Sequence, residues 1–337
     1  MNYSVVIASI SVEKDIVALK ALNQLPRKEK PIDVFVCVGR NPSFQRNLGV
    51  KHCKTPLVYF LDDDSLAIPG DIPNLISHFQ DNRTAVAGGP NLVPPDAISF
   101  EKTVNSVLAS WMGSFKVRSR YAAIGSVREA SEKELILCNM MVNRDIFMTE
   151  GGFRTDLFPN EENEFLNRLL HKGYRLVYDP RVGVYRSRRK SLGAFCFQAF
   201  RYGRGRAQQI RVYPCLSDLV HLAPAFFLFY LMTLPLPWVA GSLWPFLNIF
   251  KSFWAWIPLV IFFILSIGTG ISAASWHRRF MDVFKVPILI FYRHAFYGVG
   301  LLAGFFTPLR KPAKNVKVYK VKWTPKAYKL KLIAEDI

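Results

Sequence analysis

The sequence is poor in cysteine, and what cysteine it has shows no metal-binding spacing. The five cysteines are odd in number and form no C-x-x-C pair, which disfavours a zinc site and a disulfide framework. All have apolar neighbours, so we expect most of them to be buried free thiols: Cys37, Cys53, Cys138, Cys196 and Cys215. The short apolar run after Met1 has no charged flank, so we expect no signal peptide and a cytosolic first half.

Acidic residues become scarce only after residue 185. Residues 1–185 hold 22 Lys and Arg against 21 Asp and Glu, whereas residues 186–337 hold 22 against 4. The net charge of +19 therefore comes almost entirely from the second half. One hypothesis is a nucleic-acid binder, but such proteins place basic and aromatic side chains together on a folded face. Here the excess lies beside long apolar segments, where anionic membrane lipid accounts for it, and we expect no nucleic acid partner.

Charge is absent altogether from two long stretches, residues 219–250 and 252–277. A membrane span needs about 20 apolar residues, so we expect both to insert, the first kinked by its prolines. A third apolar segment, residues 286–309, contains Arg293 and His294. A charged residue at mid-span costs about 2.5–3.5 kcal/mol on insertion scales. We therefore expect this segment to lie in the interface or to re-enter, with both polar side chains facing the catalytic domain or lipid phosphate.

Two crossings would return the chain to its starting side. The basic loop at 277–279 and the lysine-rich tail then lie in the cytosol, as the positive-inside rule favours. Three crossings with an external tail are the alternative. The expected regions are a cytosolic α/β domain over 1–189, an amphipathic interface helix over 190–215, membrane segments over 216–309 and a basic cytosolic tail over 310–337.

Strand and helix signals alternate in the first half. Short apolar runs at 3–10, 33–38, 56–61 and 85–88 predict strands, and helical spacing over 13–24, 42–53 and 72–80 predicts the helices between them. This alternation predicts an α/β fold with a doubly wound, mostly parallel sheet. Further elements are expected as helices at 99–111, 161–172 and 191–211, a polar loop at 118–134, a strand at 135–142, and extended segments at 175–178 and 182–185.

Three carboxylates, L-D-D-D-S at 61–65, directly follow the third strand. Ligands bind beyond the carboxyl ends of parallel strands, and carboxylate oxygens at short spacing suit Mg²⁺ or Mn²⁺. A solvated turn or a helix cap is the alternative.

Two further motifs are ambiguous. Glutamates open a predicted helix in N-E-E-N-E-F at 160–165, where they either suit the helix dipole or supply a general base. The segment Q-A-F-R-Y-G-R-G-R at 198–206 is either a basic membrane-surface helix or a clamp on a diphosphate.

The order of these motifs resembles the family 2 glycosyltransferases of GT-A fold, and most closely the membrane-anchored bacterial enzymes of the succinoglycan exopolysaccharide type. The resemblance covers roughly residues 3–308. It rests on Q-R-N-L-G at 45–49, L-D-D-D-S at 61–65, Gly88-Gly89, C-N-M-M-V-N-R at 138–144, G-G-F-R-T-D at 151–156, E-E-N-E-F-L-N-R at 161–168 and Q-A-F-R-Y at 198–202.

The resemblance implies an inverting transfer of a sugar from a nucleotide-diphosphate donor, expected to be a UDP-sugar. The acceptor would be linked to polyprenyl phosphate or be a polysaccharide, at the cytosolic face of the bacterial inner membrane, where the chain also contacts membrane lipids. The cofactor would be Mg²⁺ or Mn²⁺.

The resemblance also assigns roles to individual residues. The donor would contact Ser9, Arg46, Asp62, Asp63, Gln198, Arg201 and Tyr202. Asp64, with Asp62, would hold the metal; Glu162, with Glu161 before it, would supply the base; and the acceptor would contact Gly89, Asn139 and Glu164.

Two features depart from the family pattern. No carboxylate follows the second strand, which ends in V-C-V-G-R at 36–40, so the donor base must be recognised by other means. Glu162 stands where the family usually has Asp, so Glu161 or Glu164 could be the base instead. A catalytically inactive sugar-binding or scaffold subunit of an exopolysaccharide machine is the alternative function, although retention of both carboxylate motifs argues against it.

Overall fold

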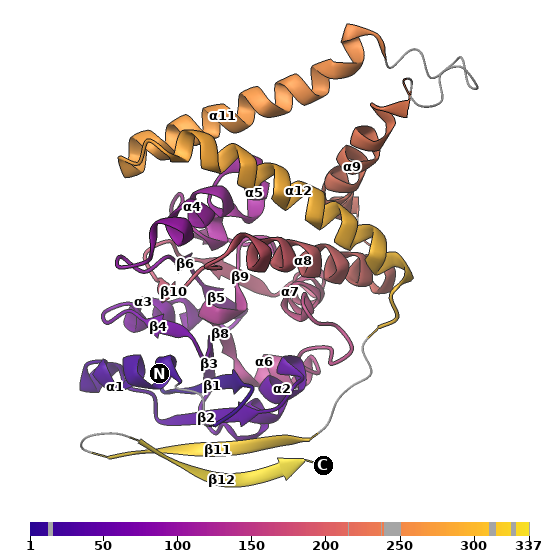
Figure 1. Cartoon of the computed structure of the whole chain (residues 1–337). Coiled ribbons are helices and arrows are strands. Elements are labelled where there is room, and N and C mark those ends of the chain that lie inside the picture. Colours follow the sequence, from indigo (N-terminus) through magenta and orange to yellow (C-terminus); the bar gives the residue numbers. More distant parts are fainter. Residues whose placement is uncertain are drawn as a thin grey trace. The chain divides into compact units, whose positions relative to one another are not determined.

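The computed structural model describes residues 1–12, 16–214, 216–236, 238, 251–309, 315–324 and 328–336 (Figure 1). The chain forms two compact units. The first comprises residues 1–97, 116–187 and 309–337, and the second comprises residues 98–115 and 188–308. The helix expected near 99–111 thus groups with the later helices, and the C-terminal residues group with the α/β unit. Both groupings differ from the boundaries expected from the sequence.

A nine-stranded sheet forms the centre of the first unit, counted over its described residues. Its strands are β1 (Tyr3–Ser9), β2 (Asp33–Val38), β3 (Leu57–Asp62), β5 (Thr84–Gly88), β7 (Arg128–Glu129), β8 (Met140–Asn143), β9 (Arg175–Tyr178), β11 (Val316–Trp323) and β12 (Tyr328–Asp336). Their order is β12-β11-β2-β1-β3-β8-β5-β9-β7.

The expected α/β fold is confirmed, but the sheet is mixed rather than mostly parallel. Strand β1 is parallel to β2 and β3, and β5 is parallel to β9. Strand β8 lies antiparallel between β3 and β5, and the C-terminal strands are antiparallel additions at the β2 edge. The apolar run of β8 predicts a buried strand, but its direction depends on the route of the preceding loop.

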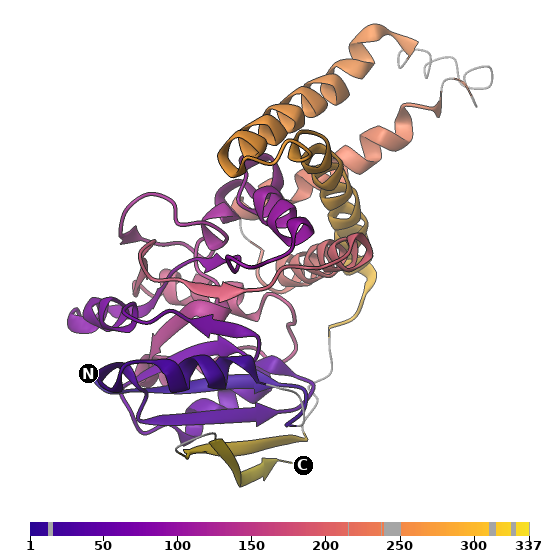
Figure 2. The ribbon, with the colours of Figure 1, turned by 60° about the vertical axis from the view of Figure 1, so that its left-hand side comes forward.

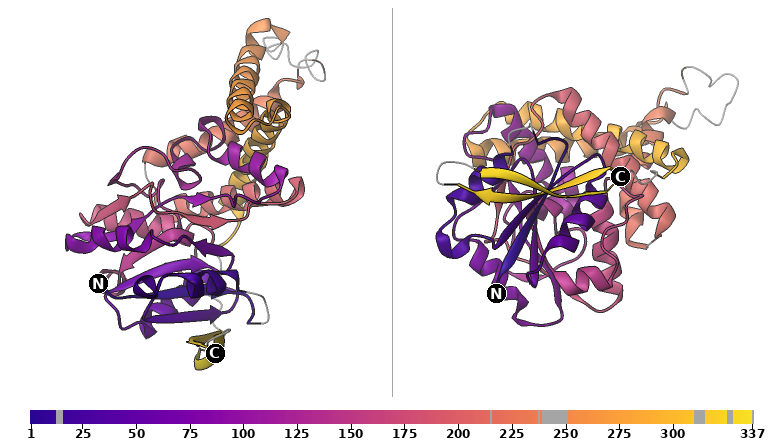
Figure 3. Two further views of the ribbon diagram at one scale, coloured as in Figure 1. Left: turned by 90° about the vertical axis from the view of Figure 1, so that its left-hand side faces the viewer. Right: turned by 90° about the horizontal axis from the view of Figure 1, so that it is seen from below.

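Helices cover both faces of this sheet (Figures 2 and 3). Helices α1 (Val17–Gln24) and α3 (Ile72–Ser77) contribute to one hydrophobic cluster. Helices α2 (Pro42–His52), α6 (Arg144–Thr149) and α7 (Glu161–His171) belong to the other. In that second cluster Phe60, Phe147, Phe153 and Phe165 pack with ring centroids 5.0–5.6 Å apart. These aromatic contacts fix the start of α7 relative to the end of β3.

A second, three-stranded sheet has the order β4-β10-β6, with β4 (Ser65–Ala67), β10 (Val184–Arg186) and β6 (Asn91–Leu92). Strands β10 and β4 are antiparallel, and their register pairs Arg186 with Ser65. This pairing brings a basic side chain beside the acidic turn that follows β3.

Residues 316–323 and 328–336, expected as part of a basic tail on a membrane leaflet, instead form an antiparallel strand pair that extends the main sheet (Figure 1). Val316 and Val318 are fully buried, while Lys317 and Lys320 form ion pairs with Glu335 and Asp33. The run V-K-V-Y-K-V-K-W alternates apolar and polar residues with the period of two that a strand requires, except at Tyr319 and Lys320, beside which the pairing with β12 is irregular. Its high lysine content led to the tail interpretation.

The hairpin constrains the membrane topology. Strand β11 pairs with β2, so both lie on the same side of any membrane. Between residues 187 and 316 the chain must therefore cross a membrane an even number of times or not at all. Three crossings with a tail on the far side are incompatible with this sheet.

The second unit is helical over its described residues. Its helices are α4 (Ser99–Leu108), α5 (Trp111–Ser114), α8 (Leu192–Val212), α9 (Ala223–Thr233), α11 (Ile257–His277) and α12 (Asp282–Phe306). Two segments are long and apolar enough to span a membrane: Phe253–His277, with mean hydropathy 2.2, and Asp282–Phe306, with mean hydropathy 1.4. Of the first expected span, Leu219–Thr233 is a shorter apolar helix, and residues 239–250 lie outside the described residues.

Helix α12 packs closely along α8 (Figure 1). A Cβ atom added at Gly300 would lie 2.0 Å from the carbonyl oxygen of Phe200, and one at Gly203 would lie 2.1 Å from that of Tyr297. Only glycine permits this approach. Arg293 donates to the Gly113 carbonyl and to Ser114 Oγ, and His294 pairs with the Met112 carbonyl. Arg293 and His294 therefore contact α5, which the expected boundaries placed in the catalytic domain over 1–189 but which groups with the second unit.

We predict that Val318→Ala lowers the unfolding free energy by about 2 kcal/mol, because two buried methyl groups are lost and a cavity remains. The measurement is thermal unfolding of the purified chain in detergent, followed by near-ultraviolet circular dichroism. Leu332→Ala is the control on β12, because its side chain is 45% exposed. A free tail would leave the melting temperature unchanged in both variants.

Candidate active site

The site begins where β1 and β3 end at the same edge of the sheet. Their parallel register pairs Ala8 with Asp62, which brings the residues that follow each strand close together. Ser9 Oγ donates a hydrogen bond of 3.0 Å to Asp63 Oδ2. The structure thus joins two of the residues expected to bind the donor.

The carboxylate of Asp62 forms ion pairs with two guanidinium groups. Arg46 Nη2 from α2 lies 2.6 Å from Asp62 Oδ1, and Arg186 Nη1 from β10 lies 2.8 Å from Asp62 Oδ2. Arg46 also contacts Glu161 Oε1 at 3.2 Å through its other terminal nitrogen. The Arg46 side chain is 6% exposed, so this link between the acidic turn and α7 is largely shielded from water.

Arg186 also bridges two of the acidic residues. Its Nε lies 2.8 Å from Asp64 Oδ1, so one guanidinium group holds Asp62 and Asp64 together. Exposure increases from 20% at Asp62 to 41% at Asp64, which leaves Asp64 accessible to a ligand. Over the described residues no three His, Cys, Asp or Glu side chains form a ready metal site.

The first turn of α7 supplies the other carboxylates. It begins after Asn160, whose φ of 106° is in the left-handed region that Asn tolerates better than most residues. Arg120, the last residue of a 3-10 helix (Phe115–Arg120), donates to Asn163 Oδ1 at 2.5 Å, and its Nη1 lies 3.6 Å from Glu162 Oε1. This buried arginine ties the polar loop to the start of α7.

The three glutamates of this turn have different environments. Glu161 is 2% exposed, and burial, reinforced by the charge of Glu162, raises its pKa to about 8 despite the Arg46 contact. Its Oε2 has no hydrogen-bond partner among the described residues. Glu164 is held by a two-pronged contact with Arg168, at 2.9 Å for each oxygen. Glu162 is 15% exposed, which makes it the most accessible of the three carboxylates.

Two residues expected to bind the acceptor have mainly internal contacts. Asn139 is buried; it accepts from Tyr59 Oη at 2.7 Å and donates to the carbonyls of Pro90 and Val182. At Gly89 an added Cβ would lie 1.9 Å from the Val182 carbonyl oxygen. Both residues pack the chain behind the acidic turn, so their acceptor role stays a prediction.

The expected clamp residues belong to the second unit, on α8. Gln198 Nε2 donates to Tyr202 Oη at 3.2 Å, one helical turn away, and the Arg201 guanidinium lies 6.0 Å from the Phe197 ring centroid. Their role at the donor stays a prediction.

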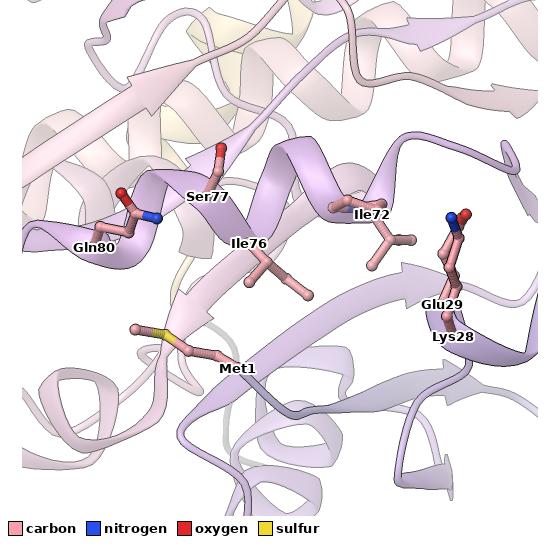
Figure 4. A pocket seen from close by; sticks show the side chains of 8 residues that line it. Met1, Lys28, Glu29, Ile72, Ile76, Ser77 and Gln80 are labelled. Carbon is pink, nitrogen blue, oxygen red and sulfur yellow. The ribbon is translucent and has the colours of Figure 1, made fainter.

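Outside the acidic site, a pocket is lined by Met1, Lys28, Glu29, Ile72, Pro73, Ile76, Ser77 and Gln80 (Figure 4). None of the carboxylates after β3 or at the start of α7 lines it. Glu29 in its lining accepts a hydrogen bond from the Gly70 amide at 2.8 Å.

Sequence reasoning missed two arginines of the site. Arg186 stands at the head of R-S-R-R-K at 186–190, which resembles a basic run before a helix, and it lies 122 residues from Asp64. Arg120 lies in a polar loop with no periodic pattern. The end of the extended segment at 182–185 is the only signal that could have singled out Arg186, because functional residues often follow strands.

The chain is similar in sequence to curated glycosyltransferases. The chain is 27% identical over 184 residues to the pre-mycofactocin glycosyltransferases of two Mycobacterium tuberculosis strains, CDC 1551 / Oshkosh and H37Rv. The match covers 50% of this chain, and it spans only 35% of the length of those relatives.

Two solved structures align with the chain at low identity and with TM-scores below 0.5. A mannosyltransferase, PcManGT of Pyrobaculum calidifontis in complex with GDP-Man and Mn²⁺, is 13% identical with a TM-score of 0.49, over 90% of this chain and 87% of that one. GalNAc-T7 with UDP, GalNAc and Mn²⁺ is 13% identical with a TM-score of 0.38, over 55% and 43%. Residues 57–268, which include the acidic turn, α7 and Arg186, match one protein family. The chain belongs to glycosyl transferase family group 2.

Proposed function

We propose that this glycosyltransferase moves a sugar from a nucleotide-diphosphate donor to an acceptor hydroxyl, with inversion, at the carboxyl edge of the main sheet. The observation that carries the proposal is the contact of Arg46 with both Asp62 and Glu161. This contact joins the acidic turn after β3, which would bind the donor and a divalent ion, to helix α7, which would supply the base. Inversion needs one displacement, hence one base and no protein nucleophile.

Glu162 is the preferred base. It is partly exposed, whereas Glu161 is buried with a raised pKa and Glu164 is occupied by Arg168. In the proposed step Glu162 takes the proton of the acceptor hydroxyl, the acceptor oxygen bonds to the anomeric carbon, and the bond from that carbon to the diphosphate breaks. Adjacent carboxylates with different environments suit such a division of roles.

The departing diphosphate needs positive charge nearby. Arg46 and Arg186 supply it from the protein, although both already contact carboxylates. Asp64, with Asp62, would hold Mg²⁺ or Mn²⁺, because these ions are commonly bound by one or two carboxylates together with substrate phosphates. A bound ion would supply further charge neutralisation at the diphosphate.

We propose a UDP-sugar as donor and a polyprenyl-phosphate-linked or polysaccharide acceptor at the cytosolic face of a bacterial inner membrane, in exopolysaccharide assembly. The two long apolar helices and the basic second half support a membrane location. The name of the curated relatives, pre-mycofactocin glycosyltransferase, offers a different acceptor class. A non-catalytic scaffold is the alternative function.

The test is a donor screen with the purified chain in detergent. UDP-, GDP- and dTDP-sugars are incubated with Mg²⁺ or Mn²⁺, and release of the nucleoside diphosphate is measured. We expect release from one donor class and none from the others. Glu162→Gln should reduce the rate by roughly two to four orders of magnitude while still binding donor.

Glu161→Gln is the matched control for the base, because it is the neighbouring residue with the same change. It should retain most of the activity. If Glu161→Gln is inactive and Glu162→Gln is active, the base is the preceding residue. No release from any donor, with the wild-type chain folded, would favour the scaffold.

The raised pKa of Glu161 predicts a pH-dependent stability. The pKa of Glu161 in the folded protein, about 8, exceeds its ordinary value of 4.5. The contribution of Glu161 to the free energy of unfolding is therefore fully present below pH 4.5 and is lost as the pH rises through about 8. Glu161→Gln should therefore melt at a higher temperature than the wild type at pH 8.5, with the difference shrinking toward pH 4.5. Glu129→Gln, at a side chain that is 79% exposed, is the control. An equal difference at both pH values would contradict the assignment.

We propose that residues 219–250 and helix α11 cross the membrane while α12 lies at its surface, because α12 packs along the arginine-bearing helix α8. In a cysteine-free variant, a cysteine at Lys251 should then react with an impermeant maleimide in intact spheroplasts, whereas one at Arg278 should react only after lysis. Lys329→Cys, in β12, should also need lysis. The reverse pattern at positions 251 and 278 would indicate that α11 and α12 cross instead.

A further inference from the structure

Arg186 occupies the position between the two carboxylates expected to hold a divalent ion. Its Nη1 lies 2.8 Å from Asp62 Oδ2 and its Nε lies 2.8 Å from Asp64 Oδ1. The antiparallel register of β10 with β4 fixes this placement, because it pairs Arg186 with Ser65, the residue after Asp64. Ser65 is fully buried, so the backbone that carries the guanidinium is well anchored.

We propose that Arg186 is a built-in counter-ion that a divalent ion must displace from Asp62 and Asp64, so that the ion binds tightly only when it arrives with the donor diphosphate. The proposal rests on the proposed function, since it takes the diphosphate as the new partner of the released guanidinium. Arg186 is thus a positioning residue for the metal and a binding residue for the donor.

Charge explains why the two events are coupled. Without a ligand, Arg186 offsets the mutual repulsion of Asp62 and Asp64, and a divalent ion alone would have to break both ion pairs and leave the guanidinium beside a second cation. A diphosphate offers that guanidinium new oxygens, which Arg can bind with two parallel hydrogen bonds. The Arg186 side chain is 26% exposed, so it has room to turn toward a ligand.

The site holds further positive charge that remains when Arg186 moves. Arg46 stays on Asp62, where it lies against Oδ1 while Arg186 lies 2.8 Å from Oδ2. Asp62 is therefore never without a cation, whereas Asp64 exchanges Arg186 for the metal. This makes Asp64 the carboxylate at which the competition between guanidinium and ion should be measured.

The experiment measures Mn²⁺ binding to the purified full chain, in detergent and without nucleotide, by the loss of the electron paramagnetic resonance signal of free Mn²⁺. Arg186→Gln removes the competing charge and keeps a polar side chain. We expect it to bind Mn²⁺ roughly tenfold or more tightly than the wild type, which corresponds to about 1.4 kcal/mol. Arg186→Lys keeps the charge but loses the two-pronged bridge, and its affinity should lie between the two.

Two controls make the result specific. Arg83→Gln makes the same change of net charge in the same unit at a side chain that is 80% exposed, and it should leave Mn²⁺ affinity unchanged. The double variant Arg186→Gln with Asp64→Asn should lose the gain, which places the bound ion at Asp64. Thermal unfolding of each variant checks that it is folded.

The proposal is overturned if folded Arg186→Gln and Arg186→Lys bind Mn²⁺ no more tightly than the wild type, or if Arg83→Gln gains as much. It is also overturned if the wild type transfers sugar at full rate in excess chelator, because Arg186 would then replace the metal permanently.

Since the binding assay needs no donor, a gain of Mn²⁺ affinity without any donor turnover would support the displacement and contradict the proposed function. Donor turnover without a gain of Mn²⁺ affinity would support the proposed function and contradict the displacement.

Discussion

The site depends on the carboxylate of Asp62, at which two guanidinium groups from distant parts of the chain meet. Arg46 reaches it from α2 and Arg186 from β10, at 2.6 and 2.8 Å. Removing one partner of such a shielded pair costs far more than the pair contributes, because the other charge is left without compensation. The arrangement therefore holds the acidic turn, α2, α7 and the small sheet in one geometry, which a site for a charged donor requires.

That geometry also separates the roles of neighbouring acidic residues. Glu161 and Glu162 are adjacent in sequence, yet one is enclosed beside Arg46 and the other is accessible beside Arg120. On a helix, consecutive side chains point about 100° apart, so two adjacent glutamates need not share an environment. The left-handed backbone at Asn160 starts the helix at this point and so determines which glutamate is enclosed.

Much of the fold could be predicted from local patterns. The strands at β1, β2 and β3 and the helix α7 agree with their apolar periodicity, and the carboxylates after β3 do lie at the edge where such folds bind ligands. Arg186 and Arg120 could not be found from such local patterns. Arg186 reaches Asp64 only through the register of β10 with β4, and Arg120 reaches Glu162 only through the route of a loop. Contacts between residues so distant in sequence depend on the tertiary fold and leave no local pattern.

The C-terminal hairpin shows the opposite case, in which the local pattern was present but composition obscured it. Lysines alternate with buried valines along β11, and two of those lysines are matched by Asp33 and Glu335. Because β11 completes the sheet beside β2, the chain must return to the side of the acidic site after its apolar helices. The same strand pairing that adds two strands to the main sheet therefore allows the apolar helices only an even number of membrane crossings or none, and it links the folding of the α/β unit to the topology of those helices.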